Sequence, residues 1–447
     1  MDTYRDTFSA RSVLPVSAAE AFAWHTRPGA FERLSPPWER VAVVAHSGTG
    51  VEDGARLTIE LRKGPLRKRW VAVHSDYEPG RRFVDTQESG PFAFWRHTHT
   101  VEPVDESSCT LEDAIEYALP GGQLATRVGA PLTHRALQRM FTFRHVRTYD
   151  DLARHAAYAE RPRLRIGVSG SGGLVGSSLC AFLSTGGHEV VRIRRDGPTW
   201  SSAGLDGLDA VVHLAGEPIA QRWSPAAKER ILASRDEGTA ALVALLAAQP
   251  QPPRTFLSAA AIGIYGDRGD EELTEASAPG SGFLTDVCTG WEAAASTGTA
   301  AGMRVVQARL GVVLSPGGGA LAKLLPPFLA GAGGPVGNGR QWFSWIGLDD
   351  VIGALHHLLQ HDEISGAVNL VGPAPVRNKE LARTLGKVLH RPALLPAPAP
   401  AIAAAFGEMG RATLLGSQRV LPAALAASGF TFLAPTLEEA LRRELGR

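Results

Sequence analysis

A glycine-rich segment after the apolar run at residues 164–168 has the residue types that bind a diphosphate. Its glycines are spaced as Gly170-x-x-Gly173-x-x-Gly176. Such glycines let a chain turn sharply and approach a pyrophosphate, and a helix that starts there offers free N–H groups and the positive end of its dipole. The segment predicts a dinucleotide site, with a flexible turn as the alternative. The expected contact residues are Gly170, Ser171, Gly172, Gly173, Leu174, Val175 and Gly176.

The end of the next predicted strand bears on which dinucleotide is bound. An acidic residue there favours the free ribose hydroxyl of NAD, whereas arginine accommodates the 2′-phosphate of NADP. This chain has Arg194 and Arg195, followed by Asp196. The two arginines favour NADP(H), and Asp196 keeps NAD(H) open. A solvated basic turn is the structural alternative.

A further strand is expected to end at the same edge of the sheet. It is followed by Leu214, Ala215 and Gly216, and the two small residues would let the cofactor pass. Close packing of the chain on itself would need the same small residues. These three residues complete the predicted cofactor site.

The elements that position these residues alternate between strand and helix after a junction near residue 160. This alternation predicts an α/β Rossmann-type domain with a doubly wound parallel sheet. The predicted strands are 164–168, 188–194, 209–214 and 255–258, and the predicted helices are 174–185 and 225–248.

The chain before the junction has an α+β pattern. Ser17 and Glu20 have the spacing of a capping box, which predicts a short helix. Alternating apolar and polar runs then predict an antiparallel sheet, and a long helical pattern over 131–157 closes the unit. The predicted strands are 41–45, 56–61, 69–73, 83–86, 92–101 and 109–119.

The composition excludes several functional classes. Lys and Arg total 46 against 45 for Asp and Glu, and both signs stay balanced on either side of residue 161. A chain without a basic region is not expected to bind nucleic acid. The longest apolar stretch, 393–406, contains three prolines and is too short to span a membrane. Three scattered cysteines form no disulfide framework, so a cytoplasmic protein is expected.

Residues 163–447 resemble an epimerase-type, extended short-chain dehydrogenase/reductase, and more narrowly a little-characterised subfamily called epimerase family proteins. The resemblance spans this whole part and includes a family-specific tail at about 393–447. The carrying segments are 214–220, 263–267, 283–292, 309–314, 325–328, 339–346, 416–422 and 429–440.

The resemblance implies a Tyr-x-x-x-Lys pair that relays protons, but the second part contains none. When Glu292 is placed where the larger family often has an acidic residue, Leu284 and Cys288 occupy the Tyr and Lys positions. The substitutes that we consider for catalysis are Tyr265 and Ser258, although Tyr265 is equally well explained as a packed aromatic residue. The expected substrate contacts are Glu217, Arg340 and Ser344, and a plain surface turn is the alternative for Arg340.

Residues 1–158 resemble the START/Bet v 1-like, polyketide-cyclase-like ligand binders. In that helix-grip fold a curved sheet wraps a long helix around an apolar cavity. Several aromatic residues and one methionine, given at the end of this paragraph, could line such a cavity. Each of them could instead simply fill the core. His97 and His99 share one face of a strand, but no third ligand is evident, so no metal site is expected. The candidate lining residues are Trp38, Trp70, Phe92, Phe94, Trp95, Met140 and Phe141.

Two hypotheses about function follow from these features. In the first, the chain is an NADP(H)-dependent oxidoreductase or epimerase-like enzyme with atypical catalytic residues and a small-molecule substrate. In the second, it is a non-catalytic NADP(H)-binding sensor coupled to a domain that binds an apolar ligand. The cofactor turn motivates the first hypothesis, and the missing proton relay motivates the second. The oligomeric state and the substrate stay open.

Overall fold

The structure is a computed structural model that describes residues 4–48, 50–196 and 199–447. It divides into two compact units, one formed mainly by the chain up to Pro162 and the other mainly by the chain from Arg163 onward. Among the described residues, no helix combines the length and the apolar character that a membrane crossing requires.

The first unit is built on one antiparallel sheet with the strand order β1-β7-β6-β5-β4-β3-β2. Six of the strands were predicted, and β1 was not. Its register with β7 places Phe8 and Leu14 on the buried face. The bounds are β1 Asp6–Leu14, β2 Arg40–Ser47, β3 Arg56–Lys63, β4 Leu66–Glu78, β5 Arg82–Ser89, β6 Phe94–Pro103 and β7 Cys109–Ala118.

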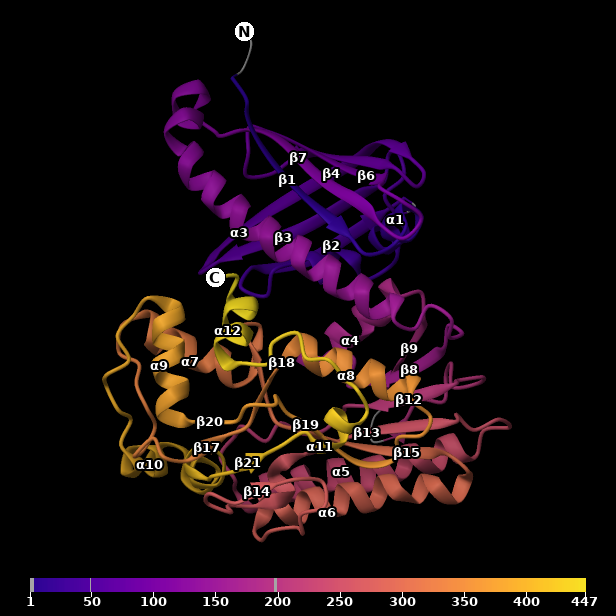
Figure 1. Cartoon of the computed structure of the whole chain (residues 1–447), viewed down its shortest axis with the longest axis vertical. Coiled ribbons are helices and arrows are strands. Elements are labelled where there is room, and N and C mark those ends of the chain that lie inside the picture. The colour runs from indigo at the N-terminus through magenta and orange to yellow at the C-terminus, as the bar shows by residue number, and fades with distance from the viewer. Residues whose placement is uncertain (1–3, 49, 197–198) are drawn as a thin grey trace. The chain divides into compact units, whose positions relative to one another are not determined.

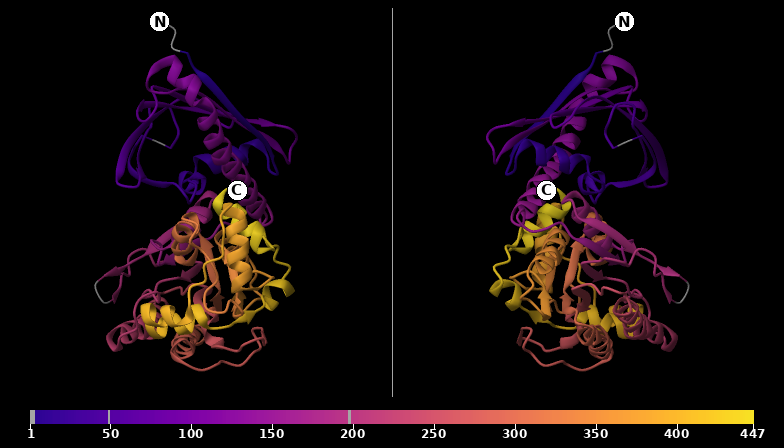
Figure 2. Two further views of the ribbon diagram at one scale, coloured as in Figure 1. Left: turned by 90° about the vertical axis from the view of Figure 1, so that its left-hand side faces the viewer. Right: turned by 90° about the vertical axis from the view of Figure 1, so that its right-hand side faces the viewer.

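Three helices accompany this sheet: α1 (Ala18–Thr26), α2 (Ala30–Leu34) and α3 (Gly122–Ala156). Ser17 caps α1 by accepting a hydrogen bond from the amide of Glu20, as the capping box predicts. The long helix α3 runs across one face of the sheet, which curves around it (Figures 1 and 2). This arrangement is the helix-grip architecture that the sequence predicts.

The start of α3 differs from the prediction. The helix begins at Gly122, so Pro131 lies inside it. The hydroxyl of Thr126 donates to the carbonyl of Gly122 and accepts from the amide of Leu119. These bonds tie the start of α3 to the residue that follows β7. The N–H that Pro131 lacks concerns a different group, the carbonyl of Arg127 four residues earlier.

The second unit contains a parallel sheet with the order β19-β15-β13-β12-β8-β9. Consecutive strands β8 and β9 lie side by side, whereas β12 pairs with the other edge of β8. The strand order therefore reverses at β8, and open α/β sheets bind ligands at such a reversal. The bounds are β8 Arg165–Ser169, β9 Glu189–Ile193, β12 Ala210–His213, β13 Thr255–Ala261, β15 Arg304–Leu310 and β19 Gly366–Leu370.

Helices cover both faces of this sheet, so its central strands are buried on both sides. Figure 1 shows α5 (Pro225–Ala247) and α6 (Phe283–Ser296) on one face, and α4 (Leu174–Thr185) and α8 (Leu348–Gln360) on the other. Every residue of β12 is buried, in keeping with its apolar sequence. The predicted doubly wound fold is confirmed.

The remaining elements of the second unit are short strands, turns and a helical tail. Their bounds are β10 Arg195–Asp196, β11 Thr199–Trp200, η1 Ile262–Tyr265, β14 Glu272–Leu273, η2 Thr297–Ala301, β16 Val312–Ser315, α7 Gly319–Leu329, β17 Trp342–Phe343, β18 Trp345–Gly347, β20 Val376–Arg377, α9 Asn378–Leu389, α10 Ala399–Gly410, η3 Arg411–Leu415, β21 Arg419–Val420, α11 Ala423–Ala427 and α12 Leu437–Leu445.

Candidate functional site

The glycine-rich turn between β8 and α4 is built by close backbone approaches. Gly170 has a φ of +67°, and a Cβ there would lie 2.7 Å from the carbonyl carbon of Leu214. A Cβ on Gly176 would lie 2.2 Å from the carbonyl oxygen of Gly170. Gly172, by contrast, has no neighbour within 4 Å of that position. Gly170 and Gly176 thus shape the turn, while the space next to Gly172 is open.

The ends of β8 and β12 are joined by a buried chain of hydrogen bonds. Ser169 Oγ lies 2.6 Å from His213 Nδ1, and His213 Nε2 lies 3.0 Å from Thr239 Oγ1. Burial, together with the positive charges of Arg195 and Arg235, lowers the pKa of His213 to about 3. The imidazole is therefore neutral and holds the two strand ends together at the reversal point.

The two arginines predicted to contact the cofactor have different surroundings. Arg194 is exposed at the end of β9. The Arg195 guanidinium stacks 4.5 Å from the centre of the Trp200 ring, whose Nε1 donates to the carbonyl of Gly238. Stacking on an aromatic ring restrains a guanidinium without neutralising it. Both arginines are exposed directly after β9.

Arg235, on α5, is a buried cation of the site that sequence reasoning missed. It is 7% exposed and donates from Nη1 to the backbone carbonyl of Glu217. Its guanidinium also lies 4.8 Å from the centre of the Trp291 ring. It therefore anchors the loop that follows β12. No local motif marks this residue, because its partners lie on other elements.

Tyr265 lies in the core rather than at an open surface. Its side chain is fully buried, its hydroxyl donates to Asn369 Oδ1 at 2.8 Å, and it accepts from Arg309 Nη1 at 2.9 Å. Arg309 in turn forms a two-pronged ion pair with Glu292. Burial raises the pKa of Tyr265. These contacts favour the packed-aromatic alternative, because the hydroxyl proton is already committed.

Three other hydroxyl or thiol groups are likewise buried. Ser258 Oγ donates to the carbonyl of Ala259, and Ser344 Oγ donates to Gln418 and accepts from the amide of Val420. Burial raises the pKa of Cys288 to about 12, so this thiol stays protonated. Ser258 and Ser344 therefore have structural partners, and Cys288 is not a ready nucleophile.

The remaining predicted substrate contacts lie on loops. Glu217 follows β12, and its Oε1 accepts from Gln221 at 3.1 Å. Arg340 is exposed, and its carbonyl accepts from Arg377. Nothing in the described contacts joins Glu217 to Arg340. The structure keeps Glu217 beside the predicted cofactor edge through the contact of its backbone with Arg235.

The first unit holds a second cluster of polar side chains. Asp85, His97, His99 and Asp113 form hydrogen bonds and ion pairs on the inner face of β5, β6 and β7. His145 of α3 adds a bond from Nε2 to Asp113 Oδ2 at 2.7 Å. Burial opposes the charge on His97, but Asp85 and Asp113 raise its pKa to about 9. His97 and His99 hold the pKa of Asp85 far below its usual range, although burial opposes this shift.

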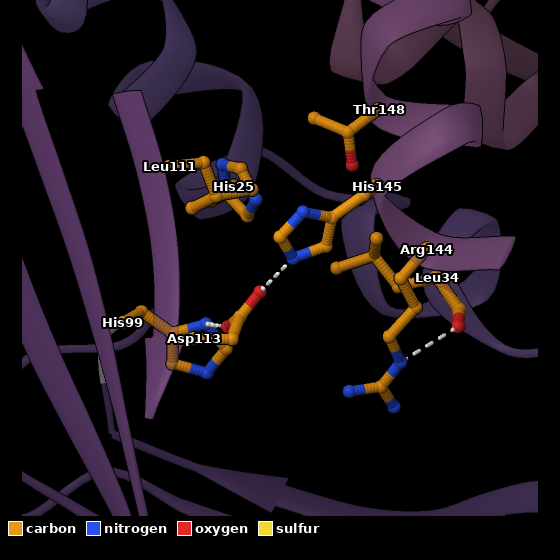
Figure 3. Close-up of a pocket in the computed structure, with 8 residues that line it drawn as sticks. All are labelled: His25, Leu34, His99, Leu111, Asp113, Arg144, His145 and Thr148. Atoms are coloured by element: carbon orange, nitrogen blue, oxygen red, sulfur yellow. Dashed lines mark hydrogen bonds and ion pairs between the residues drawn. The ribbon is translucent and has the colours of Figure 1, made fainter. Parts of the chain in front are cut away.

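A small cavity adjoins this cluster, and Figure 3 shows its lining. His145 and His99 both point at Asp113 there, and Arg144 points to the carbonyl of Leu34. Six of its eight lining residues have polar side chains, and none of the seven residues expected to line an apolar cavity is among them. Five of these seven residues instead belong to a core cluster of the first unit: Trp70, Phe92, Trp95, Met140 and Phe141. The lining residues are His25, Leu34, His99, Leu111, Asp113, Arg144, His145 and Thr148.

Comparison with known families divides the chain into three matched parts. The polyketide cyclase / dehydrase and lipid transport family matches residues 14–141. The NAD dependent epimerase/dehydratase family matches residues 166–371. A domain of unknown function, DUF1731, matches residues 397–444. These matches confirm the resemblances seen in the sequence for both units and for the tail.

Individual relatives extend these matches. An epimerase family protein of Mycobacterium tuberculosis (strain CDC 1551 / Oshkosh) is 41% identical over 290 residues, which are 62% of this chain and 96% of the relative. The crystal structure of human epimerase family protein SDR39U1 with NADPH is 34% identical, with a TM-score of 0.58, and the match covers 62% of this chain and 98% of that one.

One solved structure matches both units. It is described as the nucleoside-diphosphate sugar epimerase from Corynebacterium glutamicum and is 32% identical, with a TM-score of 0.80. The match covers 98% of this chain and 90% of that chain. The chain therefore belongs to the epimerase family proteins, which are extended short-chain dehydrogenases/reductases, and it carries an additional polyketide-cyclase-like domain.

Proposed function

We propose that the protein is an NADP(H)-dependent oxidoreductase or epimerase-like enzyme that acts on a small polar or nucleotide-linked substrate. The observation that carries this proposal is the turn at Gly170 and Gly176, which is closed by backbone contacts and lies where the strand order reverses. A turn built in this way is what a dinucleotide diphosphate requires.

The residues present fit such a cofactor. Gly172 and Gly173 are exposed, and the only atom near a Cβ at Gly173 would be the carbonyl oxygen of Gly170 at 3.3 Å. The first amides of a helix such as α4 have no carbonyl partner within the helix. The amides would hold the diphosphate, and Arg194 and Arg195 would hold a 2′-phosphate. The structure of human SDR39U1 with NADPH supports NADP(H) as the cofactor.

The bound nicotinamide would supply hydride transfer. The residues of this chain would position it: Ser169 and His213 fix the strand ends, and Arg235 fixes the loop that begins at Gly216. Proton transfer would differ from that of the larger family. Leu284 and Cys288 stand against Gly263, where a Cβ would lie 3.3 Å from Leu284 Cβ and 3.5 Å from Cys288 Sγ. Neither a leucine nor a protonated buried thiol relays protons at neutral pH.

A non-catalytic NADP(H) sensor is the second candidate. The burial and hydrogen bonding of Tyr265 and Ser258 favour it, because both hydroxyls have structural partners. In this function the cofactor would tune ligand binding in the polyketide-cyclase-like domain. The domain boundaries that we propose for the two functions are residues 1–158 and 163–447.

Titration of the full chain with NADPH and with NADH, followed by cofactor fluorescence, tests the shared claim. We expect tighter binding of NADPH, and we expect Gly173→Asp to abolish binding because its carboxylate would face the diphosphate. Ala300→Asp adds the same charge in η2, which directly precedes the amino-terminal end of β15, and should bind normally. Failure of the wild-type chain to bind either cofactor would refute both functions.

Turnover separates the enzyme from the sensor. The protein is incubated with fractions of a metabolite extract while NADPH absorbance is followed. Oxidation of NADPH by the wild type and by Ala300→Asp, but not by Gly173→Asp, would establish an enzyme. Silence across all fractions, with NADPH binding intact, would favour the sensor.

A further inference from the structure

Two histidines and two aspartates face one another across three neighbouring strands of the first unit. Along β6, buried residues alternate with partly buried ones from Phe94 to Val101, so His97 and His99 point to the same inner face. The strand register places Asp85 of β5 opposite His97, and Asp113 of β7 opposite His99. The four side chains therefore meet in one buried layer, although they come from three segments.

The Asp85 side of this layer has the geometry of a metal-ligand set. Asp85 Oδ2 lies 3.1 Å from His97 Nδ1 and 3.3 Å from His99 Nε2. All three ligand atoms lie within 4.8 Å of one another. Neighbouring ligands of an ion are roughly 3.0–3.4 Å apart when the bonds to the metal are about 2.1 Å, as they are for imidazole and carboxylate. The separations of Asp85 Oδ2 from the two imidazole nitrogens fall in this range.

The opposite edges of both imidazole rings are held by a second carboxylate. His97 Nε2 lies 2.8 Å, and His99 Nδ1 2.7 Å, from the same oxygen of Asp113. The other oxygen of Asp113 accepts from His145. Metal-binding histidines commonly donate their far N–H to a carboxylate, which fixes the tautomer and the ring orientation. Asp113 performs this orientation for both rings at once.

Packing holds the rings in these orientations. The His99 ring stacks on Phe83 with 4.2 Å between the ring centres and an angle of 19° between the planes. Phe141 meets His97 edge to face at 5.3 Å. The side chain of His97 is 3% exposed and that of Asp113 5%, whereas Asp85 retains 18%. The Asp85 side is thus more accessible to solvent than the Asp113 side of this layer.

We propose that this domain binds one divalent transition-metal ion through Asp85 Oδ2, His97 Nδ1 and His99 Nε2, with Asp113 positioning both imidazoles. Two imidazoles and a carboxylate suit zinc, iron(II) and similar ions, and they leave coordination positions open for water or a ligand. This site belongs to the first unit, whereas the cofactor turn belongs to the second.

Metal binding to the full chain tests this proposal. The protein is treated with a chelator and titrated with Co²⁺ and with Zn²⁺, and bound metal is counted by elemental analysis. We expect one ion per chain, and visible ligand-field bands of Co²⁺ without a thiolate charge-transfer band, because no cysteine belongs to the set. Asp85→Asn and His99→Gln should weaken binding at least 100-fold, and Asp113→Asn about 10- to 100-fold, as loss of an orienting carboxylate does.

His46→Gln is the matched control, because it removes an exposed imidazole of the same domain and should leave the affinity unchanged. Circular dichroism and thermal unfolding establish that each variant is folded. Should the ligand variants not fold, Co²⁺ should still broaden the ring ¹⁵N signals of His97 and His99 in the wild-type protein and spare those of His46. Absence of stoichiometric binding by the wild type, unchanged binding in Asp85→Asn, or broadening confined to other histidines would overturn the proposal.

Discussion

Arg309 Nη1 donates a hydrogen bond to the hydroxyl of Tyr265 at 2.9 Å, and both groups are buried. The same hydroxyl donates to Asn369, whose side-chain amide donates to the carbonyl of Leu421 in the tail. Tyr265 therefore links the end of β13 to β15, β19 and the tail. A residue with these partners contributes to stability through its hydroxyl.

We accordingly expect Tyr265→Phe to lower the stability of the second unit by about 1–3 kcal/mol, because buried polar atoms of Arg309 and Asn369 lose their partner. NADPH affinity should stay within twofold of the wild type. Denaturant unfolding and NADPH titration measure the two quantities. Tyr149→Phe, which changes a 45% exposed tyrosine, is the control. Unaltered stability together with lost turnover would instead assign the hydroxyl to catalysis.

The two kinds of glycine in the turn should respond differently to substitution. Gly176→Ala places a methyl group 2.2 Å from the carbonyl oxygen of Gly170, so the turn must shift, at a cost of about 1–3 kcal/mol. Gly172→Ala meets no atom within 4 Å and should change stability by less than about 0.5 kcal/mol. Thermal unfolding without cofactor measures both. Equal effects would contradict the assignment of Gly176 to the close helix–strand contact.

The arginines after β9 should determine cofactor preference. Arg194→Ala and Arg195→Ala should each weaken NADPH binding about 10- to 100-fold, because a charge-assisted bond to a phosphate contributes roughly 1.5–3 kcal/mol. NADH binding should change little. Fluorescence titration measures both, and Arg254→Ala, an exposed arginine directly before β13, is the control. A wild-type preference for NADH would contradict this prediction.

The buried His213 should make the second unit sensitive to acid. Its pKa is about 3 in the folded chain and about 6.5 in the unfolded chain, so the unfolded state binds the extra proton between these values. The stabilising contribution is complete above pH 6.5 and is lost as the pH falls towards 3. The loss approaches about 1.4 kcal/mol per pH unit.

Denaturant unfolding of the full chain at several pH values between 7 and 4.5 measures this dependence. His213→Gln should show a shallower loss of stability on acidification than the wild type. Burial lowers the pKa of His188 to about 4. Its contribution to the pH dependence of stability is the same in the wild type and in His213→Gln. His46→Gln, at an exposed position, should keep the wild-type dependence. Identical profiles for the wild type and His213→Gln would refute the role given to His213.

The sequence by itself determined those features that depend on neighbouring residues. Gly170, Gly173 and Gly176 directly follow a predicted strand and precede a helix, and Ser17 caps the helix that the spacing to Glu20 predicts. Most strands of both sheets were also predicted, because burial on one or both faces imposes a periodicity on consecutive residues. Strand β1 was not predicted, although Phe8 and Leu14 lie on its buried face. The start of α3 was predicted too late, at Pro131, because proline is typical of a first helical turn, whereas here it lies inside the helix.

Only the tertiary structure decided which distant side chains meet. Tyr265 and Ser258 stand in promising local sequence, but sheet pairing buries both of them among structural partners. His97 and His99 show no third ligand in their own segment. Strand register brings Asp85 and Asp113 to their two edges. Register depends on turns and on packing against the helix, so no local pattern encodes it, and this is why the polar centre of the first unit became visible only in the folded chain.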